Sequence, residues 1–160
     1  MKVSSISEVS KELKTLDKNQ LTELCLRLAK YKKENKELLS YLLFDAIDEN
    51  NYLENVKKEM DVLFTEINRK SSYTTKKGLQ KIVRIMNRFI KYTDVKRTEL
   101  ELRIYFCNKV KTARISLDAS SVISNLYYRE IEKIKTAFLK LHEDLQYDYK
   151  QELEKLGIQV

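Results

Sequence analysis

Apolar residues return every three or four positions along almost the whole chain, which is the spacing of one face of an α-helix. Between Leu21 and Ile47, two such amphipathic segments follow one another across a short polar link. A similar pair recurs between residues 75 and 111. The pattern therefore predicts an all-helical protein built from stacked helical hairpins.

Polar residues at the ends of the apolar segments predict where the helices begin. Asp17 is followed three positions later by Gln20, and Asn51 by Glu54, which is the spacing of a capping pair. Asn35 and Asp94 are the expected caps of two further helices. The expected helices span 6–15, 18–32, 36–47, 52–69, 75–92 and 95–111, followed by a segment 120–156 that is either one helix or two with a break near His142.

One stretch also fits a strand, because Leu100, Leu102, Ile104 and Phe106 alternate with other residues. No second segment shows strand character, and an isolated strand would leave its backbone groups without hydrogen-bond partners. We therefore expect a helix there.

A shift of 61 residues superimposes the second expected helix on the fifth, with Arg27 on Arg88, Lys30 on Lys91 and Tyr31 on Tyr92. This favours an internal duplication, although two amphipathic helices can also match by chance. We expect an all-α single domain, 1–160, of seven or eight antiparallel helices. It would comprise a leader helix 5–16, unit one 17–69 and unit two 75–156. Such units resemble the curved arrays of the armadillo and HEAT class. A compact helical bundle is the alternative.

The run Lys30-Tyr31-Lys32-Lys33-Glu34-Asn35-Lys36-Glu37-Leu38-Leu39, within 21–44, resembles a small bacterial family of uncharacterised all-helical proteins. The similarity extends to Tyr105-Phe106-Cys107. The resemblance implies a helical fold. It implies no activity, cofactor or partner.

Composition agrees with a helical reading, since the 160 residues include no proline and only two glycines. Cys25 and Cys107 both lie among apolar residues, so we expect two buried free thiols. The start of the chain lacks the apolar run of a signal peptide, and no stretch is apolar enough to span a membrane. We therefore expect a cytoplasmic protein that does not enter a membrane.

No motif for catalysis or for ligand binding emerges. His142 is the only histidine, and Gly78 stands outside any glycine-rich phosphate loop. Asp45, Asp48 and Glu49 form an acidic cluster at a helix end, but proximity in sequence does not make a catalytic pair. We expect no enzyme activity, catalytic residues, cofactor, metal or small-molecule ligand.

Charge is the sharpest feature of the sequence. Residues 34–66 hold nine acids and three bases, whereas 67–116 hold fourteen bases and three acids. Five bases of the fifth expected helix recur every three or four positions and share one face: Lys77, Lys81, Arg84, Arg88 and Lys91. We call them the basic stripe.

Like charges on one helix face repel, so the basic stripe favours a functional surface over a merely solvated one. The first hypothesis is a non-enzymatic helical scaffold that binds an acidic protein partner through this stripe. The alternative is sequence-nonspecific binding of nucleic acid through phosphates. The third reading is a solvated face, or one paired with acidic helices of the same chain.

Overall fold

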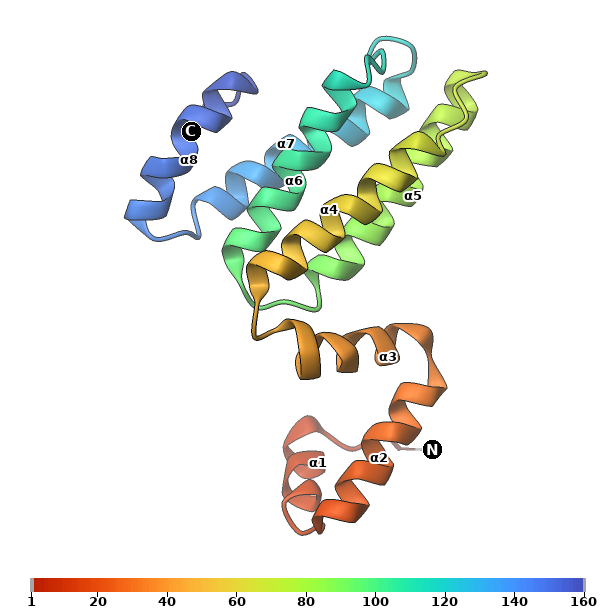
Figure 1. The fold of residues 1–160 in the computed structure, drawn as a ribbon, viewed down its shortest axis with the longest axis vertical. Helices are drawn as coiled ribbons and strands as arrows, with labels where there is room; N and C mark the ends of the chain where they lie inside the picture. Colours follow the sequence, from red (N-terminus) through yellow and green to blue (C-terminus); the bar gives the residue numbers. More distant parts are fainter. Residues whose placement is uncertain (1, 160) are drawn as a thin grey trace. The chain divides into compact units, whose positions relative to one another are not determined.

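The computed structural model describes residues 2–159, which form eight α-helices and one π-helical turn and contain no strand (Figure 1). The prediction of an all-helical fold is confirmed, including the helix through the strand-like stretch. The chain divides into two compact units, Met1–Phe44 and Asp45–Val160.

The first unit is a leader helix followed by a helical hairpin. Its elements are α1 (Ile6–Leu13), α2 (Lys18–Tyr31), α3 (Lys33–Ser40) and a π-helical turn (Tyr41–Asp45) that continues α3 across the unit boundary. Helices α2 and α3 pack against each other.

The start of α2 follows the predicted capping box. The Asp17 carboxylate accepts from the Gln20 backbone amide at 2.9 Å, and the Asp17 amide donates to the Gln20 side chain at 3.0 Å. The predicted Asn35 cap is wrong. Helix α3 begins after Lys32 without a side-chain cap, and the Asn35 amide side chain instead donates to the Leu28 carbonyl of α2 at 2.9 Å. Asn35 therefore ties the two helices of the hairpin together.

Apolar residues of the first unit are largely uncovered. Among its described residues only Tyr41 is buried. Leu42 and Phe44 belong to the expected helix 36–47, yet they are not covered by neighbours and are 57% and 72% exposed. No further helix of this unit packs over them, so these apolar side chains remain at the surface.

The second unit contains α4 (Glu49–Thr65), α5 (Ser72–Ile90), α6 (Lys96–Thr112), α7 (Ser121–Phe138) and α8 (Glu143–Lys155). Helices α4 to α7 lie alongside one another and alternate in direction, and α8 runs back beside α6 and α7 (Figure 1). Their fully buried side chains, such as Met60, Met86, Phe106, Ile134 and Leu153, form the core of this unit.

Helix α6 explains the strand-like alternation. It packs against α4, α5 and α7, and its Lys111 ammonium also donates to the Leu156 carbonyl beyond α8. Neighbours on all these sides bury Leu100, Leu102 and Ile104 even though they do not share one helical face. A helix apolar around most of its circumference is an interior helix.

Helix starts in the second unit differ slightly from the predicted ones. Asp48, rather than Asn51, caps α4, and its carboxylate accepts from the Asn51 amide. Helix α6 follows Val95 with no side-chain cap, so the predicted Asp94 cap is wrong. Helix α5 begins at Ser72, inside the stretch expected to be a loop, because Ser71 and Thr74 cap it reciprocally.

The last apolar segment forms two helices, so the open question about 120–156 is answered. Helix α7 ends at Phe138, and His142 precedes α8 as its cap residue. The boundary between compact units falls after Phe44, within the predicted unit one (17–69), because α4 packs with α5 and α6. The internal duplication and the superhelical arrangement stay predictions.

Candidate interaction surfaces

The basic stripe lies on α5, opposite its buried side. Leu79, Ile82 and Met86 point into the core of the unit. On the other side, Lys77, Lys81, Arg84 and Lys91 are exposed and Arg88 is half-buried. The helical periodicity therefore places four of the five predicted residues at the surface.

The bases of the stripe differ in their partners. The Lys81 ammonium lies 3.6 Å from the Glu66 carboxylate, but both side chains are about half exposed, so this pair contributes little. The Arg88 guanidinium lies 5.4 Å from the centre of the Phe89 ring. Within residues 2–159, Arg84 and Lys91 form no ion pair. Arg84 and Lys91 therefore present charge that no carboxylate of the described residues compensates.

Tyr73 extends the stripe toward the start of α5. The ammonium groups of Lys76 and Lys77 lie 4.9 and 4.6 Å from the centre of its ring. A hydrogen bond from Lys77 and the charges of both lysines lower the pKa of the Tyr73 hydroxyl. An exposed aromatic ring flanked by two cations is a surface that accepts an anion or a second ring.

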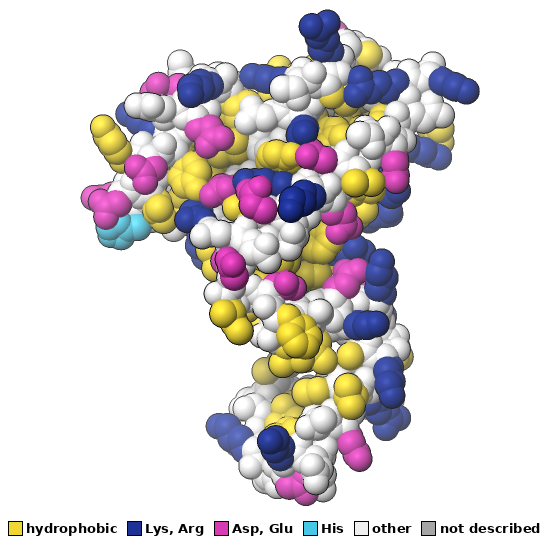
Figure 2. All heavy atoms as spheres, in the orientation of Figure 1, with side chains coloured by type: hydrophobic (Ala, Val, Ile, Leu, Met, Phe, Trp, Pro, Cys, Tyr) yellow, Lys and Arg dark blue, Asp and Glu magenta, His cyan; other side chains and the backbone are white. Residues whose placement is uncertain are grey.

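The hairpin of the first unit carries a groove that the sequence did not reveal. This α2–α3 groove has a volume of about 270 Å³, and its apolar lining consists of Cys25, Leu28, Ala29, Leu38, Leu39 and Leu42. Figure 2 shows apolar side chains at the surface of this unit, which is drawn in the lower part of the picture. Cys25 lies in the open groove, so the prediction that it is buried is wrong, whereas Cys107 is fully buried.

Bases alternate in sequence with the residues that line this groove. The segment 27–36 holds five bases and one acid. Arg27, Lys30, Lys32, Lys33 and Lys36 are all exposed, and within the described residues only Lys33 forms an ion pair, 3.4 Å from Glu37. An apolar groove next to unpaired cations can be recognised by a partner that is apolar on one face and acidic at its edges.

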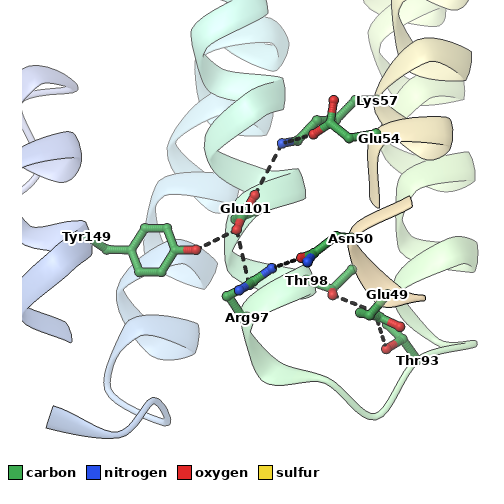
Figure 3. Close-up of polar contacts among 9 residues, drawn as sticks. All are labelled: Glu49, Asn50, Glu54, Lys57, Thr93, Arg97, Thr98, Glu101 and Tyr149. Atoms are coloured by element: carbon green, nitrogen blue, oxygen red, sulfur yellow. Dashed lines mark hydrogen bonds and ion pairs between the residues drawn. The ribbon is translucent and has the colours of Figure 1, made fainter. Parts of the chain in front are cut away.

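A row of polar side chains joins three helices of the second unit (Figure 3). Glu101 of α6 is its centre. Its carboxylate accepts from the Tyr149 hydroxyl of α8 at 2.5 Å and pairs with Lys57 of α4 at 3.2 Å and with Arg97 at 3.3 Å. Burial opposes the charge on Lys57, yet the nearby Glu54 and Glu101 carboxylates raise its pKa overall. Each charge in this row has a partner, which indicates a structural connection between helices.

The acids at the start of α4 also have hydrogen-bond partners. The Glu49 carboxylate accepts from the hydroxyls of Thr93 at 2.7 Å and Thr98 at 2.5 Å (Figure 3). Asp48 serves as the α4 cap. Glu49 therefore holds the start of α4 against the start of α6, and Asp48 serves α4 itself.

An ion pair is buried in the core of the second unit. The Arg103 guanidinium of α6 contacts the Glu130 carboxylate of α7 at 2.5 Å and Glu99 at 2.8 Å, and it donates to the Asn87 side chain of α5 at 3.1 Å. Lys133 also lies 2.7 Å from Glu130. No local pattern in the sequence points to this cluster, because Arg103 stands within a run of core residues.

Cys107 lies close to this buried cluster. Burial, assisted by the negative charge of Glu130, raises the pKa of its thiol to about 12. A thiol with this pKa is protonated at neutral pH and is a poor nucleophile.

Across residues 2–159, no group of three or more His, Cys, Asp or Glu side chains is placed to hold a metal ion. None of the helices in this range combines the length and the apolar character needed to cross a membrane.

The fold and surfaces thus define a class, an all-helical protein with an apolar groove and a basic helix face. No protein-family model matches the sequence, and no curated protein or solved structure matches it either. The resemblance of residues 21–44 to a bacterial helical family stays a prediction.

Proposed function

We propose that the chain is a non-enzymatic helical scaffold that binds an acidic protein partner, and that the α2–α3 groove receives an amphipathic helix of that partner. The observation that carries the proposal is the groove itself, which is open, lined by leucines and flanked by exposed lysines. Helices commonly bind other proteins by laying an apolar face into such a groove. Acidic residues beside that face would meet the bases of segment 27–36.

The two free thiols support a place in the reducing cytoplasm, because an exposed cysteine such as Cys25 is prone to oxidation elsewhere.

A designed peptide tests the groove directly. The probe is a fluorescein-labelled amphipathic helix with a leucine stripe and glutamate flanks, and binding is followed by fluorescence anisotropy. Leu28→Asn with Leu42→Asn should weaken binding at least about tenfold, since both side chains line the groove. The matched control is Leu26→Asn, on the same helix and half exposed at 50%, but outside the groove.

The same peptide with lysine flanks should bind more weakly than the glutamate form. Equal binding of both peptides, or equal losses for the groove variant and the control, would contradict the proposal.

Nucleic acid is the second candidate, and it concerns the basic stripe of α5. The observation that favours it is the surface position of Lys77, Arg84 and Lys91 on a helix that itself contains no acid. If all five bases of the stripe each neutralise a phosphate, log K falls against log salt with a slope of about −4.5.

Anisotropy titrations with labelled DNA and RNA at two salt concentrations measure this slope. Lys77→Glu with Arg84→Glu should abolish binding and leave the fold intact, because both side chains are exposed. Arg88 is unsuitable for this test since it is half-buried. Absence of binding at low salt, or a flat salt response, would remove this candidate.

A further inference from the structure

A cavity lies at the end of the second unit where two interhelical links meet. The α4–α5 link (66–71) approaches the α6–α7 link (113–120), and the Arg69 guanidinium donates to the Ala113 carbonyl at 2.7 Å. The two links and the start of α5 line an open pocket with a volume of about 380 Å³, which we call the link cavity. Its size is within the range of small-molecule sites.

Three cations line the link cavity. They are Arg69 and Lys70 from the first link and Arg114 from the second. No acid is among the lining residues. The nearest acids in sequence lie outside it: Glu66 pairs with Lys81, and Asp118 is an exposed residue of the second link. Figure 2 shows Lys and Arg side chains gathered over this upper end of the unit. The link cavity is therefore a surface pocket that concentrates positive charge.

Hydroxyl groups and a helix terminus add further donors. Ser72, Thr75 and Ser116 line the cavity, and Ser72 is the first residue of α5. The first amides of a helix have no partner within it and carry partial positive charge. The first turn of α5 contains no acid that would neutralise them. Ile115 and Ile123, both buried, supply an apolar part of the wall.

Arg114 occupies an unusual backbone position. Its φ is 51°, in the left-handed region, and it is the only non-glycine residue with positive φ in the described part of the chain. Glycine would adopt this conformation without strain. Arginine at a position that favours glycine suggests that its side chain has a binding role that offsets the backbone strain.

We propose that the link cavity binds the phosphate group of a small phosphate ester. The planar guanidinium groups of Arg69 and Arg114 match phosphate oxygens in pairs, and Lys70 adds a point charge. The Ser72 and Ser116 hydroxyls donate to the remaining oxygens, whereas the Thr75 hydroxyl donates to the Ser71 carbonyl. The isoleucines contact the apolar part of the ester. This site is separate from the α2–α3 groove and from the basic stripe.

Isothermal titration calorimetry of the full chain tests the site. The probes are inorganic phosphate, glucose 6-phosphate and adenosine monophosphate, with glutarate at equal ionic strength as a dicarboxylate. We expect saturable binding of one equivalent, tighter for at least one ester than for inorganic phosphate. Comparison of the sugar and nucleoside esters identifies the class of ligand. Absence of saturable binding at millimolar concentration, or equal affinity for glutarate, would overturn the proposal.

Two variants separate binding from folding. Arg114→Gly removes a cation at a position that glycine fits, so it should keep the melting temperature and weaken phosphate-ester binding at least about tenfold. Arg69→Gln should also weaken binding, although it loses the bond to Ala113. Lys140→Gln, on an exposed site outside the cavity, removes the same charge and should have no effect. Equal losses for Arg114→Gly and Lys140→Gln would mean general charge attraction and would also overturn the proposal.

Discussion

The two cysteines occupy opposite environments. Cys25 is exposed in the α2–α3 groove, whereas Cys107 is buried beside the Arg103–Glu130 pair, where the pKa of its thiol rises to about 12. Both stand among apolar residues in the sequence, so their local patterns do not distinguish them. The difference arises because α6 has neighbours on nearly every side and α2 does not.

At pH 8, dithionitrobenzoate should therefore titrate one thiol in the native protein and two after unfolding in guanidinium. Cys25→Ser should leave no native reaction, since Cys107 is buried and protonated at this pH. Absorbance at the thionitrobenzoate band measures both. Rapid reaction of Cys107 in native Cys25→Ser would contradict its buried placement.

Arg103 and Glu130 depend on each other because both side chains are removed from water. Glu130→Leu leaves the buried guanidinium with a reduced set of carboxylate partners and should lower the free energy of unfolding by about 3–5 kcal/mol. Urea denaturation measures the change. The double variant Arg103→Met with Glu130→Leu should lose less free energy of unfolding than Glu130→Leu alone, because neither buried charge is left without its partner. If the loss in the double variant equals the sum of the losses in Arg103→Met and Glu130→Leu, the two residues are not coupled.

At the scale of elements, Gly78 sets how closely the end of α4 approaches α5. A Cβ atom built at Gly78 would lie 3.0 Å from the Cγ1 atom of Ile67, which is itself buried. In the sequence, Gly78 is only an isolated glycine within an expected helix. The contact has no sequence signature, since it depends on the path of the chain after α4.

Gly78→Leu should therefore destabilise the second unit by about 1–3 kcal/mol through overpacking, even though leucine favours a helix more than glycine does. The matched control is Gln80→Leu, at an exposed position two residues along α5, with an expected change within about 0.5 kcal/mol. Thermal unfolding followed by circular dichroism measures both. A Gly78→Leu variant as stable as the parent would show that Ile67 moves aside freely.

Helix ends show what a local pattern can and cannot predict. The Asp17–Gln20 box was predicted correctly because its two partners are three residues apart. The Asn35 and Asp94 caps were wrong because α3 and α6 begin without a side-chain cap. Asn35 bonds instead across the hairpin to Leu28, and α6 is fixed by Thr98, which donates to Glu49. Contacts between helices replaced the local caps.

At the scale of the whole molecule, the core is unevenly shared. Residues 45–160 contain the fully buried side chains, whereas among residues 2–44 only Tyr41 is buried. A segment of this length with so few buried residues gains little from burial to offset the entropy of ordering its chain.

Expressed alone, residues 45–160 should remain helical and unfold cooperatively with heat. A peptide of residues 1–44 should be largely unfolded at micromolar concentration, because it has three short helices and almost no core. Circular dichroism of both fragments measures this. A fully helical 1–44 peptide that stays monomeric on ultracentrifugation would contradict the prediction.

The sequence by itself determined the helical class, most helix positions and the surface face of α5. These follow from the three- and four-residue spacing of apolar side chains, which depends only on the geometry of a single helix. Only the tertiary structure decided which apolar faces are covered, as Leu42 and Leu100 show by their opposite exposure. It also decided which cations line the same pocket, since Arg69 and Arg114 come from separate links. Periodicity gives each side chain a direction, whereas burial and binding depend on what another part of the chain places there.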